Sequence, residues 1–530
     1  MVRHKPNLVL VGFMGAGKTT IGRELAVHLG RAFVDLDAAI ADRAGQSISE
    51  IFALHGEEYF RQLEAEVTRD IALGTGQVIA TGGGTITNPD SLTALRRTGV
   101  VIWLAPPLEL LLKRILTPHS SRPLVRMGPE ALRELYYERE QFYRLADYKV
   151  TPAVDYEIAD TVSQIIAVLD PDNPTIEVTT PTAHYPFRLS RDFNFPELAR
   201  LKPGRAILVT DTTVGGLYAE QVSEMLVGAG WQVTPVVLPP GEKTKTLTNA
   251  ELIWRIGFDA GLDRHGLIVA LGGGVIGDLA GFAAATYMRG TGFLIIPTTL
   301  LAMVDSSIGG KVAINHERGK NLIGAFHHPR AVLAPLDSLA SLDERNLAAG
   351  WAEVVKSALI GDAAYFQQLS TDLPSLSETA TLAEAVFRSA RVKRDIVNQD
   401  QFESGVRKNL NLGHTLGHCL EQATGFDKLL HGEAVAIGMV FAAMAAEKLG
   451  LAEEPLTSRI ERLLTHYKLP TKWPAGVATA DAIKPVSLDK KNQAGRITLI
   501  LPSAAGKVIE TSVTLIEFTR LVEQFRGELA

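Results

Sequence analysis

The sequence is poor in several features that mark particular classes of protein. It has one cysteine, Cys419, among 530 residues, so no intrachain disulfide can form and a reducing compartment suits it. It has no block of basic residues and a net charge of −6, which argues against a nucleic-acid partner. Its longest notable apolar run, 434–446, is too short to cross a bilayer and suits a buried helix. We therefore expect a cytoplasmic protein with no membrane partner.

Length and composition predict several globular domains. A chain of 530 residues is too long for one core, and 46% apolar with 21% charged residues is typical of soluble globular protein. The first apolar run, Leu8–Val11, comes so early that no room is left for a signal peptide. We expect two to four domains.

A phosphate-binding motif stands near the N-terminus. Residues 12–19, GFMGAGKT, fit the pattern G-x-x-x-x-G-K-[ST]. The run before it predicts a buried strand, and Thr20–Leu29 has helical spacing, so the motif lies between a strand and a helix. Backbone N–H groups of such a P-loop surround an anion at a helix N-terminus. The residues expected at the nucleotide are Gly15, Ala16, Gly17, Lys18, Thr19 and Thr20, with Lys18 at the outer phosphates and Thr19 on Mg²⁺.

The order of periodic patterns predicts the domain organisation. Strand and helix patterns alternate over residues 1–168, which predicts a parallel sheet covered by helices. A segment rich in Pro, Asp and Thr predicts a linker over 169–182. Alternation resumes over 183–334, and 335–530 is mostly helical in pattern. The expected strands are Leu8–Val11, Ala32–Asp35, Val78–Thr81, Val100–Leu104, Ala206–Thr210, Gln232–Leu238, Leu267–Leu271, Phe293–Ile296 and Arg496–Leu501.

The expected fold class is therefore α/β. A P-loop kinase-like parallel sheet comes first, and a Rossmann-like α/β domain and a mainly α-helical domain follow.

Two aspartates follow the second predicted strand. Asp35 and Asp37 are two residues apart, so on a strand they point to one side, at the sheet edge where ligands bind. One carboxylate can hold Mg²⁺ through water and the other can orient a substrate hydroxyl. Helix capping explains an aspartate after a strand equally well.

Glycines and arginines complete the candidate set of the first domain. Gly82–Gly84 follow another predicted strand and allow a ligand to approach the backbone, although a plain tight turn has the same composition. Arg61, Arg122 and Arg139 have the fork that suits carboxylate and phosphate, although a single arginine is more often a surface residue.

Taken together, these motifs resemble shikimate kinase over about residues 5–168. The resemblance implies ATP with Mg²⁺ as cofactor, with Thr19 and Asp35 serving the metal, and catalysis by Lys18 and Asp37. It implies that Asp37 binds the reacting hydroxyl of shikimate. It also implies that Arg61, Gly83 and Arg139 hold the ring and carboxylate, and that Arg122 comes down on the phosphates with a lid over 118–129. Another small-molecule P-loop kinase, acting on gluconate or a nucleotide, is the alternative.

A second glycine-rich loop follows the predicted strand Leu267–Leu271. Gly272, Gly274 and Gly277 satisfy G-x-G-x-x-G, which alone is a weak signal. The acidic residue expected about 20 positions later is missing, since Thr298 stands there, and Asp211 is a better candidate for the ribose. The loop predicts a nucleotide phosphate site, but not an ordinary Rossmann half.

Histidines and a glutamate suggest a metal site in the helical region. His414 and His418 are four apart and share a helix face, as in zinc proteases, but Thr415 replaces the Glu of H-E-x-x-H and argues against a peptidase. Glu353 lies upstream and His431 downstream. One Glu and two His around an open position suit catalytic Zn²⁺. Ordinary polar residues of a helical domain are the alternative.

Cations are numerous in the distinctive motifs of this region. A plain sugar-alcohol dehydrogenase does not need so many, whereas a substrate with a phosphate and a carboxylate does. Each lysine alone is most simply a surface residue. The residues are Arg289, Lys311, Lys320, Lys356, Lys393, Arg407 and Lys490.

These motifs resemble 3-dehydroquinate synthase over about residues 178–525. The resemblance rests on the segments 240–245, 273–278, 297–301, 305–311, 320–324, 350–356, 411–418, 431–433 and 489–491. It implies Glu353, His414 and His431 as ligands of Zn²⁺ (or Co²⁺) and His418 as a substrate contact. It implies catalysis by Lys356, Lys393 and His418, and a homodimer through this module.

The same resemblance implies the cofactor and substrate contacts. NAD+ is expected at Glu242, Lys245, Gly274, Val275, Ile276, Gly277, Asp278, Thr298, Thr299, Lys311, Lys320 and Ser341. Ser341 begins the segment 341–345, in which the Leu-Pro that the family usually shows before a similar Glu is absent. Substrate is expected at Arg289, Asn321, Arg407, Asn411 and Lys490.

The two resemblances together predict a bifunctional enzyme of aromatic amino acid biosynthesis. It phosphorylates shikimate and converts 3-deoxy-D-arabino-heptulosonate 7-phosphate into 3-dehydroquinate and phosphate. A P-loop kinase fused to a metal-dependent NAD polyol dehydrogenase is the main alternative. A degenerate enzyme kept as a scaffold is another, against which the intact Lys18, Asp37, Glu353, His414 and His431 weigh.

Overall fold

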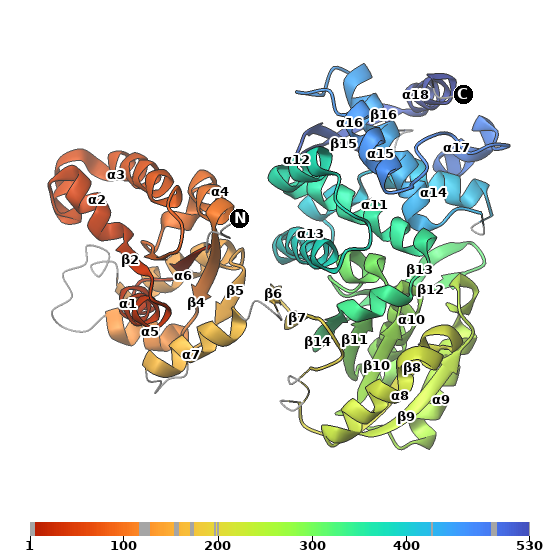
Figure 1. Cartoon of the computed structure of the whole chain (residues 1–530), viewed down its shortest axis with the longest axis horizontal. Helices are drawn as coiled ribbons and strands as arrows, with labels where there is room; N and C mark the ends of the chain where they lie inside the picture. The colour runs from red at the N-terminus through yellow and green to blue at the C-terminus, as the bar shows by residue number, and fades with distance from the viewer. Residues whose placement is uncertain are drawn as a thin grey trace. The chain divides into compact units, whose positions relative to one another are not determined.

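The computed structural model describes residues 6–115, 128–152, 158–169, 174–195, 198, 201–425, 428–488 and 496–528. The chain divides into two compact units, Met1–Pro171 and Asp172–Ala530, whose elements are labelled in Figure 1. Two of the expected site residues, Arg122 and Lys490, and most of the expected lid lie outside the described residues.

A parallel sheet forms the centre of the first unit. Its order is β2-β3-β1-β4-β5, and each neighbouring pair is parallel. Every residue of β1 is buried, as expected for a strand covered on both faces. The strands are β1 (Asn7–Val11), β2 (Ala32–Asp35), β3 (Gln77–Ala80), β4 (Gly99–Leu104) and β5 (Tyr148–Val150). The helices are α1 (Lys18–Leu29), α2 (Leu36–Ala44), α3 (Ile48–Ala72), η1 (Thr85–Thr87), α4 (Pro89–Thr98), α5 (Leu108–Ile115), α6 (Gly128–Tyr143) and α7 (Ile158–Val168).

The strand order places the P-loop at a switch point of this sheet. β1 pairs with β3 on one side and β4 on the other, so crossovers leave it in both directions. A crevice forms at the carboxyl end of such a strand. The loop between β1 and α1 lies at that end, as its sequence context predicts.

The sheet of the second unit has the order β6-β7-β14-β11-β10-β8-β9. All its pairs are parallel except β6–β7. Its strands are β6 (Thr175–Thr179), β7 (His184–Ser190), β8 (Arg205–Asp211), β9 (Gln232–Leu238), β10 (Leu267–Gly272), β11 (Gly292–Pro297) and β14 (Ala331–Pro335). A separate antiparallel hairpin comprises β12 (Lys311–His316) and β13 (Gly319–Phe326). The helices here are α8 (Thr212–Gly228), η4 (Glu242–Thr244), α9 (Leu247–Asp259), α10 (Gly274–Thr286), η5 (Tyr287–Arg289), the π-helical η6 (Ala302–Ser306) and η7 (Leu336–Ser341).

Strand β6 corrects the expectation of a linker over 169–182. Residues 175–179 pair with β7 along the edge of the sheet, and Ile176 and Val178 are buried. Only two apolar residues alternate within this Thr- and Pro-rich segment, so its composition concealed a short strand.

The C-terminal part of the second unit is mainly helical. Its helices are α11 (Glu344–Gly361), α12 (Ala363–Asp372), α13 (Thr379–Gln399), η8 (Val406–Asn411), α14 (His414–Ala423), α15 (His431–Lys448), α16 (Thr457–His466), α17 (Thr479–Leu488) and α18 (Leu515–Glu528). A hairpin of β15 (Arg496–Ala504) and β16 (Lys507–Thr514) accompanies them. Residues 434–446 form the buried middle of α15, as predicted. Among the described residues, no helix is both long and apolar enough to span a membrane.

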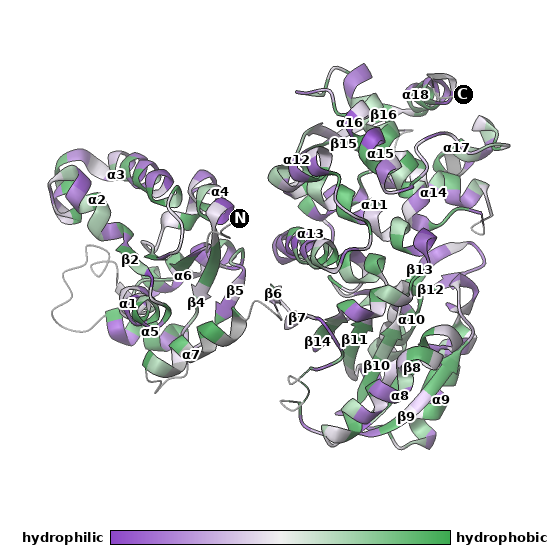
Figure 2. Ribbon diagram, viewed as in Figure 1, coloured by the Kyte–Doolittle hydropathy of each residue, from purple (hydrophilic) through white to green (hydrophobic). Residues whose placement is uncertain are grey.

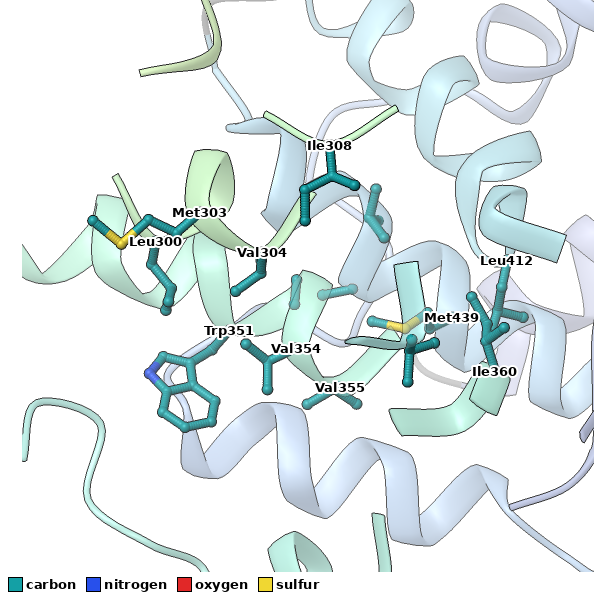
Figure 3. Packing of buried hydrophobic residues seen from close by; sticks show 14 of the residues in the cluster. Leu300, Met303, Val304, Ile308, Trp351, Val354, Val355, Ile360, Leu412 and Met439 are labelled. Atoms are coloured by element: carbon teal, nitrogen blue, oxygen red, sulfur yellow. The ribbon is translucent and has the colours of Figure 1, made fainter. Parts of the chain in front are cut away.

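One hydrophobic core joins the sheet and the helices of the second unit. It runs from Ile176 in β6 to Phe525 in α18. Helix α11 lies within it, and residues 347–360 are buried without exception. Figure 3 shows Trp351, Val354 and Val355 of this helix among residues of the 300–308 segment and of α15. In Figure 2 the strands inside the sheets are largely hydrophobic, whereas the surrounding helices mix hydrophobic and hydrophilic residues. Charged groups on α11 are therefore held rigidly.

Two candidate active sites

The P-loop of the first unit is shaped to receive an anion. Gly12, Gly15 and Gly17 have φ of 143°, 80° and 87°, and a Cβ on Gly12 would lie 2.5 Å from the carbonyl oxygen of Leu104. Gly17 caps α1 without a side-chain hydrogen bond, which leaves the N–H groups of the first turn for a ligand. Lys18 Nζ donates to the carbonyl oxygens of Gly12 and Phe13 at 2.8 and 3.1 Å, so it lies across the loop.

The two aspartates do not share a strand, which corrects the geometric argument made for them. β2 ends at Asp35, and Asp37 already belongs to the first turn of α2. Asp35 Oδ1 caps this helix by accepting from the N–H groups of Asp37 and Ala38 at 3.1 and 3.3 Å. Asp35 Oδ2 accepts from Thr19 Oγ1 at 2.8 Å, so the two residues expected at Mg²⁺ are in contact. Asp35 therefore caps α2 and contacts Thr19 at the same time.

The glycines after β3 bring the expected substrate residues together. A Cβ on Gly82 would lie 2.9 Å from Asp37 Oδ1. A Cβ on Gly83 would lie 3.5 Å from Arg139 Nη1, and one on Gly84 would lie 2.8 Å from Arg61 Nη1. Each of the three glycines therefore faces a different charged side chain at the carboxyl edge of the sheet.

Two buried residues that the sequence did not single out hold this turn in place. Tyr143 is fully buried, stacks on Trp103 with 5.9 Å between ring centroids, and donates from its hydroxyl to the Gly83 carbonyl at 2.5 Å. Glu64 accepts from Arg61 Nη1 and from Thr85 Oγ1, both at 2.7 Å. These contacts join α6 and α3 to the glycine turn, and only the assembled fold reveals them.

The glycine loop of the second unit also opens a helix N-terminus. Gly273 caps α10 without a side-chain hydrogen bond, and the first turns hold Gly274, Val275, Ile276, Gly277 and Asp278. A small cavity lies beside this loop, and Gly273, Asp278, Ser306 and Lys311 contribute to its lining. The loop follows β10, between β8 and β11, so it lies at the edge where nucleotides bind in α/β sheets.

Polar residues from three elements meet beside α10. Lys245 is buried and pairs with Asp278 and with the side-chain oxygen of Asn321. Asn315 Nδ2 donates to Glu242 Oε1 at 2.7 Å. Four of the expected cofactor and substrate residues, Glu242, Lys245, Asp278 and Asn321, therefore belong to one network.

The other residues expected at the cofactor lie where strands β8 and β11 and the helix η7 end. Thr298 and Thr299 follow β11, and the buried Thr298 Oγ1 has no hydrogen-bond partner among the described residues. Asp211 Oδ1 caps α8 by accepting from the N–H groups of Thr213 and Val214, both at 2.9 Å. Ser341 ends η7, where its Oγ donates to the Ser338 carbonyl at 2.8 Å.

Glycines allow the helices that carry the metal-site residues to approach closely. His431 is the first residue of α15, and a Cβ on the following Gly432 would lie 2.0 Å from the Ala349 carbonyl oxygen of α11. His414 is the first residue of α14, and Gly413 before it has φ of 78°. A Cβ on Gly413 would lie 2.8 Å from the Val435 carbonyl oxygen of α15. Larger residues would push these helices apart.

Glu353, His414 and His431 converge in the space between those helices. Glu353 Oε1 lies 3.6 Å from His431 Nε2 and 4.0 Å from His414 Nε2. The ligand atoms of the three residues all lie within 4.8 Å of one another. Glu353 is fully buried, its Oε2 pairs with the Lys356 ammonium, and its Oε1 faces the two imidazoles without a hydrogen-bond partner among the described residues. This donor set, two imidazoles and a carboxylate, suits zinc.

Electrostatics favour an ionised Glu353. Burial alone would raise its pKa, but the neighbouring Lys356 and the histidines hold it at about 2. Burial and the charge of Lys356 lower the pKa of His414, which keeps that imidazole neutral and able to bind a metal. Burial opposes a charge on His431, but its contacts with Glu353 and Glu421 raise the pKa of this imidazole to about 9.

Asp305, a residue that the sequence did not single out, holds two catalytic candidates. Its Oδ1 lies 2.7 Å from Lys393 Nζ and 3.9 Å from Lys356 Nζ, and Lys356 also pairs with Glu353. These groups are buried except for a partial exposure of Asp305. Burial opposes ionisation of Asp305, but the two ammonium groups lower its pKa strongly. Alternating charges therefore lead from the metal cluster toward η6.

Glu403 organises a second group of the expected residues. It pairs with Lys311 and accepts from Asn411 Nδ2 at 2.9 Å, and it adopts the left-handed φ of 62°. Arg407 is buried, and its Nη2 donates to the Gly309 carbonyl at 3.0 Å. Burial lowers the pKa of Arg407. Glu403 belongs to none of the sequence motifs, and its partner Lys311 is distant along the chain.

His418 and Lys320 meet a buried glutamate. Glu421 Oε1 accepts from Lys320 Nζ at 3.2 Å, and Glu421 Oε2 lies 4.0 Å from Nε2 of the exposed His418. Glu421 Oε2 also lies 3.5 Å from His431 Nδ1. Burial opposes ionisation of Glu421, but its contacts with His431 and Lys320 hold the pKa at about 2.

Arg289 stands apart from these groups. It is exposed on η5 with φ of 67°, and it makes no hydrogen bond or ion pair with any residue that the structure describes. Its role as a substrate contact stays a prediction.

Comparison with known families divides the chain in the same way. Residues 14–170 match the shikimate kinase family. Residues 235–349 and 350–492 match the N-terminal and C-terminal domains of 3-dehydroquinate synthase. The 3-dehydroquinate synthase of Desulforamulus reducens is 45% identical over 306 residues, which cover 57% of this chain and 85% of the relative. That of Shewanella piezotolerans is 45% identical over 325 residues, which cover 61% of this chain and 90% of the relative.

Solved structures resemble the second unit. A 2-deoxy-scyllo-inosose synthase complexed with carbaglucose-6-phosphate, NAD+ and Co²⁺ is 26% identical with a TM-score of 0.60, covering 66% of this chain and 99% of its own. A 2-epi-5-epi-valiolone synthase from Streptomyces hygroscopicus subsp. jinggangensis 5008 with NAD+ and Zn²⁺ bound is 28% identical with a TM-score of 0.60. It covers 65% of this chain and 97% of its own. The chain therefore belongs to the 3-dehydroquinate synthase family and carries a shikimate kinase domain ahead of the synthase.

Proposed function

We propose that each unit performs one reaction of aromatic amino acid biosynthesis at the sites built above. The first phosphorylates shikimate with ATP, and the second converts 3-deoxy-D-arabino-heptulosonate 7-phosphate into 3-dehydroquinate and phosphate. The observation that carries the second assignment is the convergence of the buried Glu353 carboxylate with His414 and His431, beside the buried Lys356. We also propose a cytoplasmic location, for which the single cysteine is the support.

In the kinase unit the protein acts by position and charge. The P-loop amides and Lys18 are the proposed phosphate ligands, and the oxygens of Thr19 and Asp35 suit Mg²⁺, which prefers oxygen. Asp37 orients the reacting hydroxyl, while Arg61 and Arg139 hold the carboxylate at the Gly82–Gly84 turn. Phosphoryl transfer needs little covalent work from the protein beyond this arrangement.

In the synthase unit we propose that Glu353, His414 and His431 hold zinc, or cobalt in its place, and that the Gly272–Asp278 loop holds NAD+. When bound, NAD+ supplies a reversible hydride acceptor and zinc supplies Lewis-acid polarisation of a carbon–oxygen group. Lys356 pairs with Glu353, Lys393 pairs with Asp305, and the His418 ring lies 6.0 Å from that of His431. Asp305 keeps both lysines charged and oriented, so they can hold an anionic substrate.

We propose one domain for the kinase and two domains for the synthase. The kinase domain comprises 1–168, the NAD-binding domain begins with β6 and ends near 334, and the metal-binding domain comprises 335–530. The linker is thereby shortened to the residues before Thr175. The two reactions are not consecutive in the pathway, so we propose no transfer of an intermediate between the sites.

We also propose a homodimer formed by the synthase unit. Strand β13 exposes Leu322, Ile323 and Phe326, and the exposed Phe402 contacts Phe326 with 5.2 Å between ring centroids. A cluster of exposed apolar side chains favours contact with another protein. A second copy of this chain is the proposed partner, because most soluble oligomers are symmetric homo-oligomers and dimers are the commonest.

The proposal is tested by assaying both reactions with the full-length chain. With the heptulosonate phosphate, NAD+ and zinc, we expect one phosphate released per 3-dehydroquinate formed and no net NADH at 340 nm, since the hydride returns to the product. With shikimate and ATP we expect ADP formation. Steady NADH production would instead establish the polyol dehydrogenase.

A further inference from the structure

Glu421 is a buried carboxylate for which the proposed chemistry has no use. It lies on α14, and its side chain is only 4% exposed. A buried charge is tolerated only when partners compensate it. Its partners come from three different elements, namely Lys320 of β13, His431 of α15 and His418 of α14.

The two ring nitrogens of His431 face different carboxylates. Nδ1 lies 3.5 Å from Glu421 Oε2, and Nε2 lies 3.6 Å from Glu353 Oε1. A carboxylate that accepts from one ring nitrogen keeps the proton there and leaves the lone pair of the other nitrogen for a metal. At His414 the Leu412 carbonyl, 3.1 Å from Nδ1, has the same relation to the ring. Each imidazole of the cluster thus has an acceptor behind it, and only that of His431 is charged.

The other oxygen of Glu421 reaches a different part of the site. Oε1 accepts from Lys320, which lies next to Asn321 in the network around Lys245 and Asp278. One side chain therefore connects the metal cluster with the hairpin β12–β13 beside the glycine loop.

We propose that Glu421 is a positioning residue of the metal site. Its Oε2 holds His431 with Nε2 directed at the metal, and its Oε1 connects Lys320 to α14. This inference rests on the proposed metal role of Glu353, His414 and His431. Glu421 itself neither ligates the metal nor touches the reacting atoms.

The test compares Glu421→Gln and Glu421→Ala with a matched control in the full-length chain. Glu447→Gln is the control, because Glu447 lies on the same helix as His431 and accepts from the N–H groups of Leu456 and Thr457, both at 2.9 Å. Sixteen residues of helix separate it from His431, roughly 24 Å at the rise of an α-helix. The zinc dissociation constant is measured by competition with a chromogenic chelator, and thermal unfolding is measured on the metal-free protein.

We expect zinc to bind about 10-fold to 100-fold more weakly in the Glu421 variants, with alanine the weaker of the two, and normally in Glu447→Gln. The metal-free Glu421→Gln protein, whose side chain keeps its volume, should unfold at the temperature of the control.

Three results would overturn the proposal. Unchanged zinc affinity in both Glu421 variants, with or without a loss of stability, would leave only a structural role. A second bound zinc that disappears in Glu421→Gln would make Glu421 a ligand, together with His418 and His431, whose ligand atoms also lie within 4.8 Å of one another. Failure of the wild-type chain and the control to bind zinc would refute the metal assignment itself, and this inference with it.

Discussion

Replacing Lys18 with alanine is expected to lower the kcat/KM of shikimate phosphorylation by about 10³-fold, the effect of removing one preorganised donor from developing charge. Lys18 Nζ lies across the P-loop, on the carbonyl oxygens of Gly12 and Phe13, ready to turn toward the outer phosphates of ATP. Release of phosphate from the heptulosonate phosphate should remain at the wild-type rate. Parallel coupled assays of ADP and inorganic phosphate measure the two effects.

Arg43→Ala is the control for this variant. Arg43→Ala removes another cation of the same unit, which is exposed and paired with Asp70, so both activities should persist. Loss of both activities in a folded Lys18→Ala chain would contradict the division into two sites. Unchanged kinase activity in Lys18→Ala would contradict the assignment of the nucleotide site to the P-loop.

The converse change, His431→Ala, is expected to lower synthase activity by about 10³-fold or more, because a Lewis acid contributes several kcal/mol and each 1.4 kcal/mol is tenfold in rate. His431 lies at the N-terminus of α15, with Nε2 3.6 Å from Glu353 and close to His414. Phosphorylation of shikimate should be unaffected. Phosphate release measures the loss, and bound zinc per chain shows its cause.

His466→Ala serves as the control for this variant. His466 lies on α16, exposed, with its Nε2 3.0 Å from the Pro374 carbonyl. Its removal should change neither activity. A His431→Ala chain that keeps stoichiometric zinc and full synthase activity would contradict the proposed ligand set.

Much of the fold could be predicted from periodicity and turn chemistry. The strands β1, β4, β8, β10 and β11 lie where apolar runs predicted them, since buried parallel strands are continuous apolar segments. The less buried edge strands β2 and β9 also lie where they were expected. Helix α15 likewise follows from its uninterrupted apolar middle. The short edge strand β6 could not be predicted, because five residues with two buried side chains carry too little pattern.

The candidate sites were predictable only where a local motif carries the chemistry. In the second unit Glu353, His414 and His431 converge, as expected. In the first unit Lys18 lies across the P-loop, and the Gly82–Gly84 turn faces Asp37, Arg139 and Arg61. The prediction that Asp37 lies on the strand was wrong, because β2 ends at Asp35 and Asp37 lies in the first turn of α2. Residues that act through distant partners gave no signal, since their roles arise from tertiary contacts. They are Glu64, Tyr143, Asp305, Glu403 and Glu421.

The central claim is that two complete enzymes share one chain, and separating them tests it most directly. The compact units Met1–Pro171 and Asp172–Ala530 are expressed separately, and each is assayed with both substrates beside the full chain. We predict that the first phosphorylates shikimate and the second releases phosphate from the heptulosonate phosphate, each with the kcat/KM of the full chain. A folded unit that is inactive alone and regains activity when the other is added would contradict the claim.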